Sequence, residues 1–244
     1  MTFTSAVSSL GAPESSEAPM RRWVLIGFIL ILVLFGAGTY SESLWLPPID
    51  DSDEMAYLGE ASWIAEHGGA ALLIIRCYEG EYPYDNRHPL TAWWVSPWAA
   101  QSLRAVRPMR AAKVLLAVGA LALTFALCRR MMSPVAALAV MALLAASQNW
   151  YMKSRVVCAE PTIYAFFFLA WALIAGLLVP RGRWFWAGAA VALAWLTKGT
   201  ALILLAALPL AAILFVALQA RHTGWQTVSL WRPVALLLAG FLVV

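Results

Sequence analysis

The sequence predicts an all-α protein built from several transmembrane helices, and three observations lead to this prediction. Hydrophobic residues make up 62% of the 244 residues and charged residues only 12%, about half the charged share of an average soluble domain. The mean hydropathy is +0.75. Lys and Arg occur in short clusters that flank long apolar runs, as topology determinants do in membrane proteins. The net charge of +4 is therefore interpreted as a membrane feature, and no nucleic-acid partner is expected.

The chain divides into a polar tail and one transmembrane domain. Residues 1–20 are rich in Ser, Ala, Glu and Pro without an apolar period, which favours a disordered cytoplasmic tail. Residues 21–244 form the expected transmembrane domain, whose first helix covers 23–39 after two arginines. The later spans are expected over 111–128, 135–150, 162–179, 184–197 and 201–218, followed by a run over 233–244 that is too short to span and suggests a longer protein.

The residues between the first two clear spans, 41–110, are expected to form a non-cytoplasmic loop. Asp51 and Glu54 have the spacing of a helix N-terminus, and His67 precedes two glycines, so we expect a short helix over 52–66 that lies along the membrane. The segment 91–103 has three tryptophans but is short for a span of about 20 residues. Two topologies stay open at this point.

The two topologies differ in where they place Glu160. If 91–103 lies flat on the membrane, Glu160 and the 41–110 loop share the non-cytoplasmic face, and if 91–103 spans, the bilayer separates them. Counting basic residues on each side does not distinguish the two. We adopt the flat arrangement.

Acidic residues are concentrated in one stretch. Nine of the 13 fall between Asp50 and Asp85, and only Glu160 follows. Asp53 and Glu54 fall in the first turn of the expected short helix, where the helix dipole favours anions. They could serve only as capping acids, or one of them could act with Glu160 as a general base. A divalent metal between Asp53 and Glu160 stays open, and no cofactor is assigned.

Several cations could hold an anionic ligand near these acids. Lys198 interrupts about 35 apolar residues, and a lysine at the bilayer centre costs about 2.5 to 3.5 kcal/mol, so we expect it near a membrane face. Arg155 lies close to Glu160 in the sequence, and Arg87 and His88 border the first loop. The alternative is that these are ordinary interfacial residues. The chain contains no P-loop, GxGxxG or HExxH motif.

Four separated motifs resemble one family. They are Asp53-Glu54-Met55-Ala56-Tyr57, His88-Pro89-Leu90, Arg155 through Glu160-Pro161, and Leu196-Thr197-Lys198-Gly199. In order and spacing they resemble the N-terminal half of the GT-C glycosyltransferases. The resemblance is strongest to the branch of dolichyl-phosphate-mannose protein mannosyltransferases and bacterial aminoarabinose lipid A transferases, and it covers residues 23–218.

The resemblance implies a multi-pass protein of the plasma (inner) membrane with juxtamembrane helices in its first non-cytoplasmic loop. Such an enzyme moves a sugar from a polyprenyl-phosphate donor to a lipid, glycan or protein acceptor, with inversion, on the periplasmic or extracellular face. An alternative function for this chain is a transporter or lipid-binding membrane protein without catalysis.

The resemblance also implies roles for single residues. Asp53 matches the first-loop acid that acts as base on the acceptor hydroxyl, with Glu54 beside it, and Glu160 matches the second-loop acid. Lys198 matches the lysine linked to binding of the donor phosphate, a task in which Arg87, His88 and Arg155 are expected to share. The chain departs from many relatives in having Leu90 where they have a second proline.

Overall fold

The structure is a computed structural model of the chain. It describes residues 14–45, 52–67, 90–99, 106–178, 182–198 and 231–244. Every regular element in these ranges is helical, which confirms the all-α prediction for the described part of the chain. The longer helices are α1 (Glu14–Trp45), α5 (Val106–Met131), α6 (Pro134–Ala146), α8 (Glu160–Ile174), α9 (Arg183–Thr197) and α11 (Trp231–Val243).

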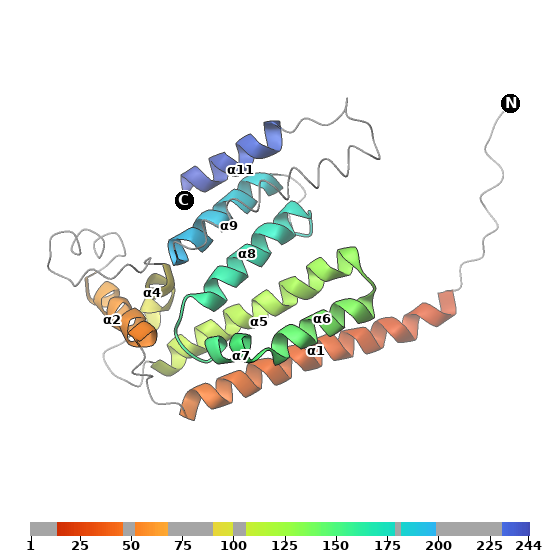
Figure 1. Ribbon diagram of the computed structural model, residues 1–244, viewed down its shortest axis with the longest axis horizontal. Helices are drawn as coiled ribbons and strands as arrows, with labels where there is room; N and C mark the ends of the chain where they lie inside the picture. Colours follow the sequence, from red (N-terminus) through yellow and green to blue (C-terminus); the bar gives the residue numbers. More distant parts are fainter. Residues whose placement is uncertain (1–13, 46–51, 68–89, 100–105, 179–181, 199–230) are drawn as a thin grey trace.

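These helices lie side by side in a row (Figure 1). α11 packs on α9, α9 on α8 and α8 on α5, while α1 and α6 both contact α5 and each other. From α1 through α5, α6 and α8 to α9, each of these longer helices runs opposite to the one before it, so the ends of α1 and α9 lie with the starts of α5 and α8, whereas α11 runs in the same direction as α9. The shorter elements gather at this same end: α2 (Ser52–His67), α4 (Leu90–Val95), the 3₁₀ turn η1 (Ser96–Trp98) and α7 (Gln148–Ser154). We call this the site end of the row.

Two described helices are long and apolar enough to cross a membrane by themselves, Arg21–Trp45 of α1 and Val106–Met131 of α5. A third candidate span is the pair α6 and α7, which meet at an angle of 63°. Ser147 causes this break, because its extended backbone ends α6 and its N–H bonds to the carbonyl of Leu144. The expected continuous span over 135–150 is therefore bent, and α7 turns aside at the site end. The expected span over 201–218 lies outside the described residues.

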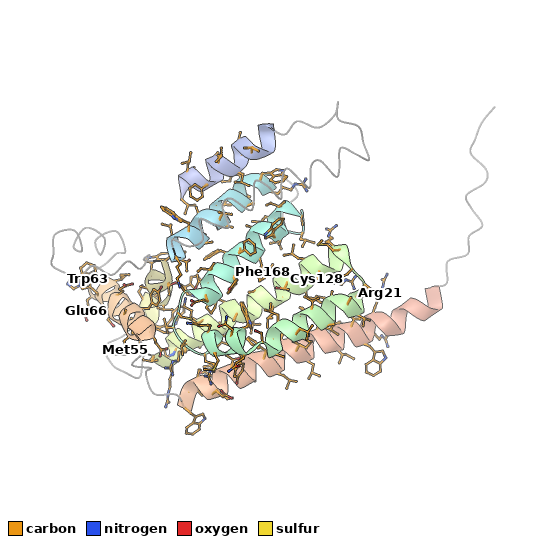
Figure 2. The ribbon with its side chains drawn as sticks, in the orientation of Figure 1. Arg21, Met55, Trp63, Glu66, Cys128 and Phe168 are labelled. Atoms are coloured by element: carbon orange, nitrogen blue, oxygen red, sulfur yellow. The ribbon has the colours of Figure 1, made fainter. Side chains whose placement is uncertain are left out.

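The two ends of the row differ in charge. The end opposite the site end is mainly basic: it carries Arg21, Arg22, Arg129, Arg130 and Arg183, and the first turns of α1 at this end also contain Glu14 and Glu17. Figure 2 shows Arg21 and Cys128 toward this end and Met55, Trp63 and Glu66 at the other. The site end holds both signs of charge. Glu54 and the segment before Glu160 lie together there, the placement that the flat arrangement of 91–103 requires.

The short helix α2 begins at Ser52 and ends at His67, which confirms the helix expected over 52–66. Asp51, which was expected to contribute to the N-terminal cap of this helix, is not among the described residues. Of the apolar face of α2, Tyr57, Leu58, Ala61 and Ile64 are buried and Ala65 is exposed. This face packs against α4 and η1, whose Ala92 and Val95 have no exposed surface. α2 and α4 thus form a small cap over the starts of α5 and α8.

α9 and α11 approach each other closely through two glycines. A Cβ atom at Gly188 would clash with the carbonyl oxygen of Leu237, and one at Gly240 would clash with that of Phe185. Small residues at such crossings let membrane helices pack backbone against backbone. This contact holds α11 against α9, while α9 itself is joined to the row by its packing on α8.

Candidate functional site

A buried ion pair holds the start of α2 in place. Arg110 Nε lies 2.8 Å from Glu54 Oε1, and Arg110 Nη2 lies 2.7 Å from Glu54 Oε2. Both side chains are almost fully buried, with exposed fractions of 1% and 2%. Such a two-pronged pair fixes the geometry of both partners. Arg110 comes from the first turns of α5, so this contact ties the first loop to the bundle.

The same ion pair forms hydrogen bonds with the backbone of two further segments. Arg110 Nη1 donates to the carbonyl oxygen of Ser43, at the end of α1, over 2.7 Å. The backbone N–H of Val157 donates to Glu54 Oε1 over 2.9 Å. Four parts of the chain, namely the end of α1, the segment after α7 and the starts of α2 and α5, therefore meet at this ion pair. These contacts occupy both oxygens of Glu54 and favour a structural role for it over the catalytic role that the sequence suggested.

Glu160 has a more open setting. Its Oε1 lies 3.3 Å from the Nζ of Lys198, and the exposed fractions of the two side chains are 22% and 42%. Its second oxygen, Oε2, is buried and has no hydrogen-bond partner among the described residues. The pair joins the start of α8 to the residue that follows α9. It brings together two of the residues that the sequence singled out, 38 positions apart.

The surroundings of Glu160 favour its ionised form. Burial raises the pKa of Glu160, but its own backbone N–H, the Cys158 thiol and the charges of Lys198 and Lys153 outweigh burial and bring the pKa below its ordinary value. Burial, together with the negative charge of Glu160, raises the pKa of the Cys158 thiol far above its usual range. Cys158 therefore stays a neutral thiol, whose Sγ lies 3.0 Å from the carbonyl oxygen of Lys153. The site offers a carboxylate and not a thiolate.

A cavity of about 260 Å³ opens beside Glu160, between the end of α6, α7 and the start of α8. Its polar lining includes Glu160, Lys153, Asn149 and the ring of Trp150. Its apolar lining consists of Leu144, Pro161, Tyr164 and Phe168. Phe168, labelled in Figure 2, lies on α8 within the row, so the cavity extends from the charged end toward the apolar part of the bundle.

Lys113 of α5 forms a buried hydrogen bond with the first turn of α8. It is fully buried, and its Nζ donates to the hydroxyl of Thr162. Lys113 lies three residues after Arg110, so both cations project from one face of α5. Arg110 thus holds the start of α2, and Lys113 holds the start of α8.

Arg155 lies on the outside of the same region. Its Nη1 is 2.6 Å from Glu42 Oε2, and its guanidinium lies over the ring of Tyr151. This contact ties the end of α7 to the end of α1. In the described structure Arg155 pairs with Glu42, and it does not line the cavity near Glu160.

The remaining predicted site residues are described only in part. Asp53 is the second residue of α2, directly before Glu54, and its backbone is described while its side chain is not. Arg87 and His88 lie outside the described residues. No group of three or more His, Cys, Asp or Glu side chains that could hold a metal ion occurs in the described ranges. The described neighbour of Glu160 is the cation Lys198 and not a second carboxylate.

The sequence interpretation missed Arg110, Lys113 and Trp150. Arg110 and Lys113 flank an apolar run, and such cations are usually interpreted as topology determinants. Their spacing of three residues was the available signal, because it places both on one helix face. Trp150 follows a polar group, Ser147-Gln148-Asn149, which in retrospect marks the end of α6.

Comparison of the chain with models of protein families, with curated proteins and with solved structures found no match. In the part of the chain that the structure describes, the fold and the site are those of an α-helical protein with two or three candidate membrane spans and a mixed-charge site at one end of its helices.

Proposed function

We propose that this chain is a membrane glycosyltransferase of the GT-C type. It moves a sugar from a polyprenyl-phosphate donor to an acceptor hydroxyl on the non-cytoplasmic face, with inversion at the anomeric carbon. The acceptor is a lipid, glycan or protein. The proposal rests on the four-motif resemblance, and the geometry of the site end supports it.

One observation carries the proposal. Segments of three motifs that lie far apart in the sequence meet at the site end through two contacts: Val157 N–H to Glu54, and Lys198 to Glu160. The remaining motif, His88-Pro89-Leu90, ends at the buried first residue of α4, a helix that packs with α2. A structural role for each motif alone does not require them to converge, whereas a shared active site does.

In the proposed reaction Asp53 is the base. The adjacent Glu54 is locked by Arg110, so the backbone at Asp53 is held at the site end. Asp53 takes the proton of the acceptor hydroxyl, and the acceptor oxygen attacks the anomeric carbon from the side opposite the phosphate. The bond from this carbon to the phosphate oxygen breaks, and its electron pair leaves with the lipid phosphate. Lys198 and the other predicted cations stabilise the departing phosphate.

The charge difference between the two ends supports the proposed orientation. Basic residues favour the cytoplasmic side of a membrane, where acidic residues count for little, and the end opposite the site carries Arg21, Arg129 and Arg183. The site end then faces the periplasm or the cell exterior. A membrane surface is where a lipid-linked donor and its acceptor would meet.

The test is transfer of radiolabelled sugar from polyprenyl phosphate to acceptors in membranes that contain the protein. Asp53→Asn is expected to lower transfer by about 100-fold or more, the usual contribution of a general base. Glu160→Gln is expected to lower it as well. Glu66→Gln is the matched control, because it makes the same change at an exposed position of α2 and is expected to behave as wild type.

Equal protein levels in the membrane are needed for the comparison. If Asp53→Asn and Glu160→Gln both transfer sugar as well as wild type, the enzymatic role of these acids is wrong. Absence of any transfer by the wild type with lipid-linked hexose and pentose donors would argue against the glycosyltransferase itself.

A further inference from the structure

The cavity between α6, α7 and α8 is lined by three residues that, among the described parts of the chain, carry an unpaired donor, an unpaired acceptor and a cation without an ion pair. At about 260 Å³ it lies just below the ~300 to 1,000 Å³ of typical small-molecule pockets. It can therefore take a small polar group, such as a lipid headgroup. The three polar groups together limit what that group can be.

The unpaired donor is the indole N–H of Trp150. Trp150 is buried, with an exposed fraction of 6%. Its Nε1 has no hydrogen-bond partner among the described residues. A buried donor without a partner costs about 1 to 3 kcal/mol. The ring contacts that of Tyr164, with centroids 5.3 Å apart, so another element fixes its position. A ligand with an acceptor oxygen in the cavity would satisfy this N–H.

The unpaired acceptor is Glu160 Oε2, which is buried beside the same cavity. The charge of Glu160 is already compensated at Oε1 by Lys198. Oε2 therefore requires a hydrogen-bond donor but not a second positive charge, which favours a hydroxyl over an ammonium group. Ser147 and Asn149 add neutral polar lining to the same wall.

The free cation is Lys153. It lines the cavity, and no ion pair of its ammonium group occurs among the described residues. An anionic oxygen within reach of both Lys153 and the Trp150 N–H would receive a charge-assisted bond and a neutral one. Phosphate is the common lipid group that offers such oxygens.

We propose that this cavity binds a polyol phosphate on a lipid, with the phosphate oxygens on Lys153 and Trp150 and a neighbouring hydroxyl donating to Glu160 Oε2. The apolar lining supports a lipid anchor. Phe168 lies eight residues beyond Glu160 along α8, about 12 Å at 1.5 Å per residue, and Leu144 faces the cavity from α6. A chain attached to the phosphate would run between these two helices.

Two lipids offer this chemistry. One is phosphatidylglycerol, whose headgroup is a phosphate with a free glycerol. The other is the sugar phosphate of a polyprenyl-linked sugar, and only this second source rests on the proposed function. Phosphatidylethanolamine has an ammonium in place of the hydroxyl, and phosphatidylcholine has no donor there.

The test is native mass spectrometry of the detergent-solubilised chain, titrated with each of these lipids and with soluble glycerol 3-phosphate. Wild type is expected to bind phosphatidylglycerol or polyprenyl-phosphate mannose at least about tenfold more tightly than phosphatidylcholine. Lys153→Gln is expected to weaken this binding about tenfold and Trp150→Phe about fivefold. Arg129→Gln is the matched control, because it removes an exposed cation at the opposite end.

Each outcome decides the proposal. Equal binding of all lipids by wild type, or equal binding of phosphatidylglycerol by wild type, Lys153→Gln and Trp150→Phe, would overturn it. A preference for phosphatidylethanolamine would overturn the assignment of a hydroxyl to Glu160. Tight binding of glycerol 3-phosphate would overturn the lipid anchor. If the chain binds phosphatidylglycerol while Asp53→Asn leaves sugar transfer unchanged, the binding site stands and the proposed function fails.

Discussion

Two ion pairs at the site end join an acid to a cation that is distant in the sequence. They differ in how many of the carboxylate oxygens have hydrogen-bond partners among the described residues. Glu54 is buried with Arg110, and its described contacts occupy both oxygens. Glu160 is half-buried with Lys198, and one of its oxygens has no described partner. Polar groups of the first kind specify a structure, because breaking them is costly. Groups of the second kind leave an oxygen atom that can accept a hydrogen bond from a ligand.

The comparison also separates two ways to interpret neighbouring carboxylates in a sequence. Asp53 and Glu54 looked equivalent as site candidates, yet the structure uses Glu54 to join four segments. A residue that holds a site together is as necessary for function as one that reacts, so loss of activity alone does not distinguish them. Stability and activity must be measured on the same variants.

The largest expected effect is on stability, from Arg110→Ala. This change leaves the Glu54 carboxylate buried without its cation, and breaking a buried pair from one side costs about 3 to 5 kcal/mol. We expect the thermal unfolding midpoint of the detergent-solubilised protein to fall by many degrees.

The double variant Glu54→Leu with Arg110→Met sharpens the same point. Apolar residues of similar volume often replace a buried pair at little cost, so the double variant should unfold at a higher temperature than Arg110→Ala. If Arg110→Ala unfolds like wild type, the pair does not hold the site end together.

A smaller loss of stability is expected from Thr162→Val. The change keeps the shape of the side chain but removes the oxygen that accepts from Lys113, leaving a buried ammonium group without this bond. The expected cost is about 1 to 3 kcal/mol, below that of Arg110→Ala. The measurement is the same unfolding midpoint. Thr124→Val is the matched control, because the described hydrogen bond of the Thr124 hydroxyl goes to the carbonyl oxygen of Ala120 in its own helix.

The helical class and the positions of several helices could be predicted from the sequence, because apolar runs and their basic flanks are local signals. The helices expected near 23–39, 111–128 and 184–197 correspond to α1, α5 and α9. The bend between α6 and α7 was not predicted, since a serine can either lie within a helix or begin one. Ser147 takes the second role, with an extended backbone.

The site was less predictable, for a physical reason. Arg110 and Glu54 are 56 residues apart, and Lys113 and Thr162 are 49 apart. No local period shows which acid a distant cation will meet. Composition identified Glu160 because it is isolated, but only the packing of α8 against α9 shows that Lys198 is its partner.

A still smaller effect on stability is expected from Lys198→Gln. Its side chain is 42% exposed, and solvent-exposed pairs contribute about 0 to 1 kcal/mol. The unfolding midpoint should therefore change little. Sugar transfer or lipid binding should nevertheless fall, because Lys198 holds Glu160 in place and adds positive charge at the site. A large drop in the unfolding midpoint would show that this pair is structural like the first.

The finest distinction between the two pairs is the pH dependence of the Glu160 site. The pKa of Glu160 lies below its ordinary value, and the charge of Lys198 is one of the causes. A lowered pKa means that the carboxylate persists at acid pH and that its contribution is lost only as the pH falls through that lowered pKa. In Lys198→Gln the pKa rises, so the acid-side loss of lipid binding should move to higher pH. Titrations of wild type, Lys198→Gln and Glu160→Gln measure this, and Glu160→Gln should lack that acid-side step. If the step is the same in all three proteins, another group titrates, and the free oxygen of Glu160 does not bind the ligand.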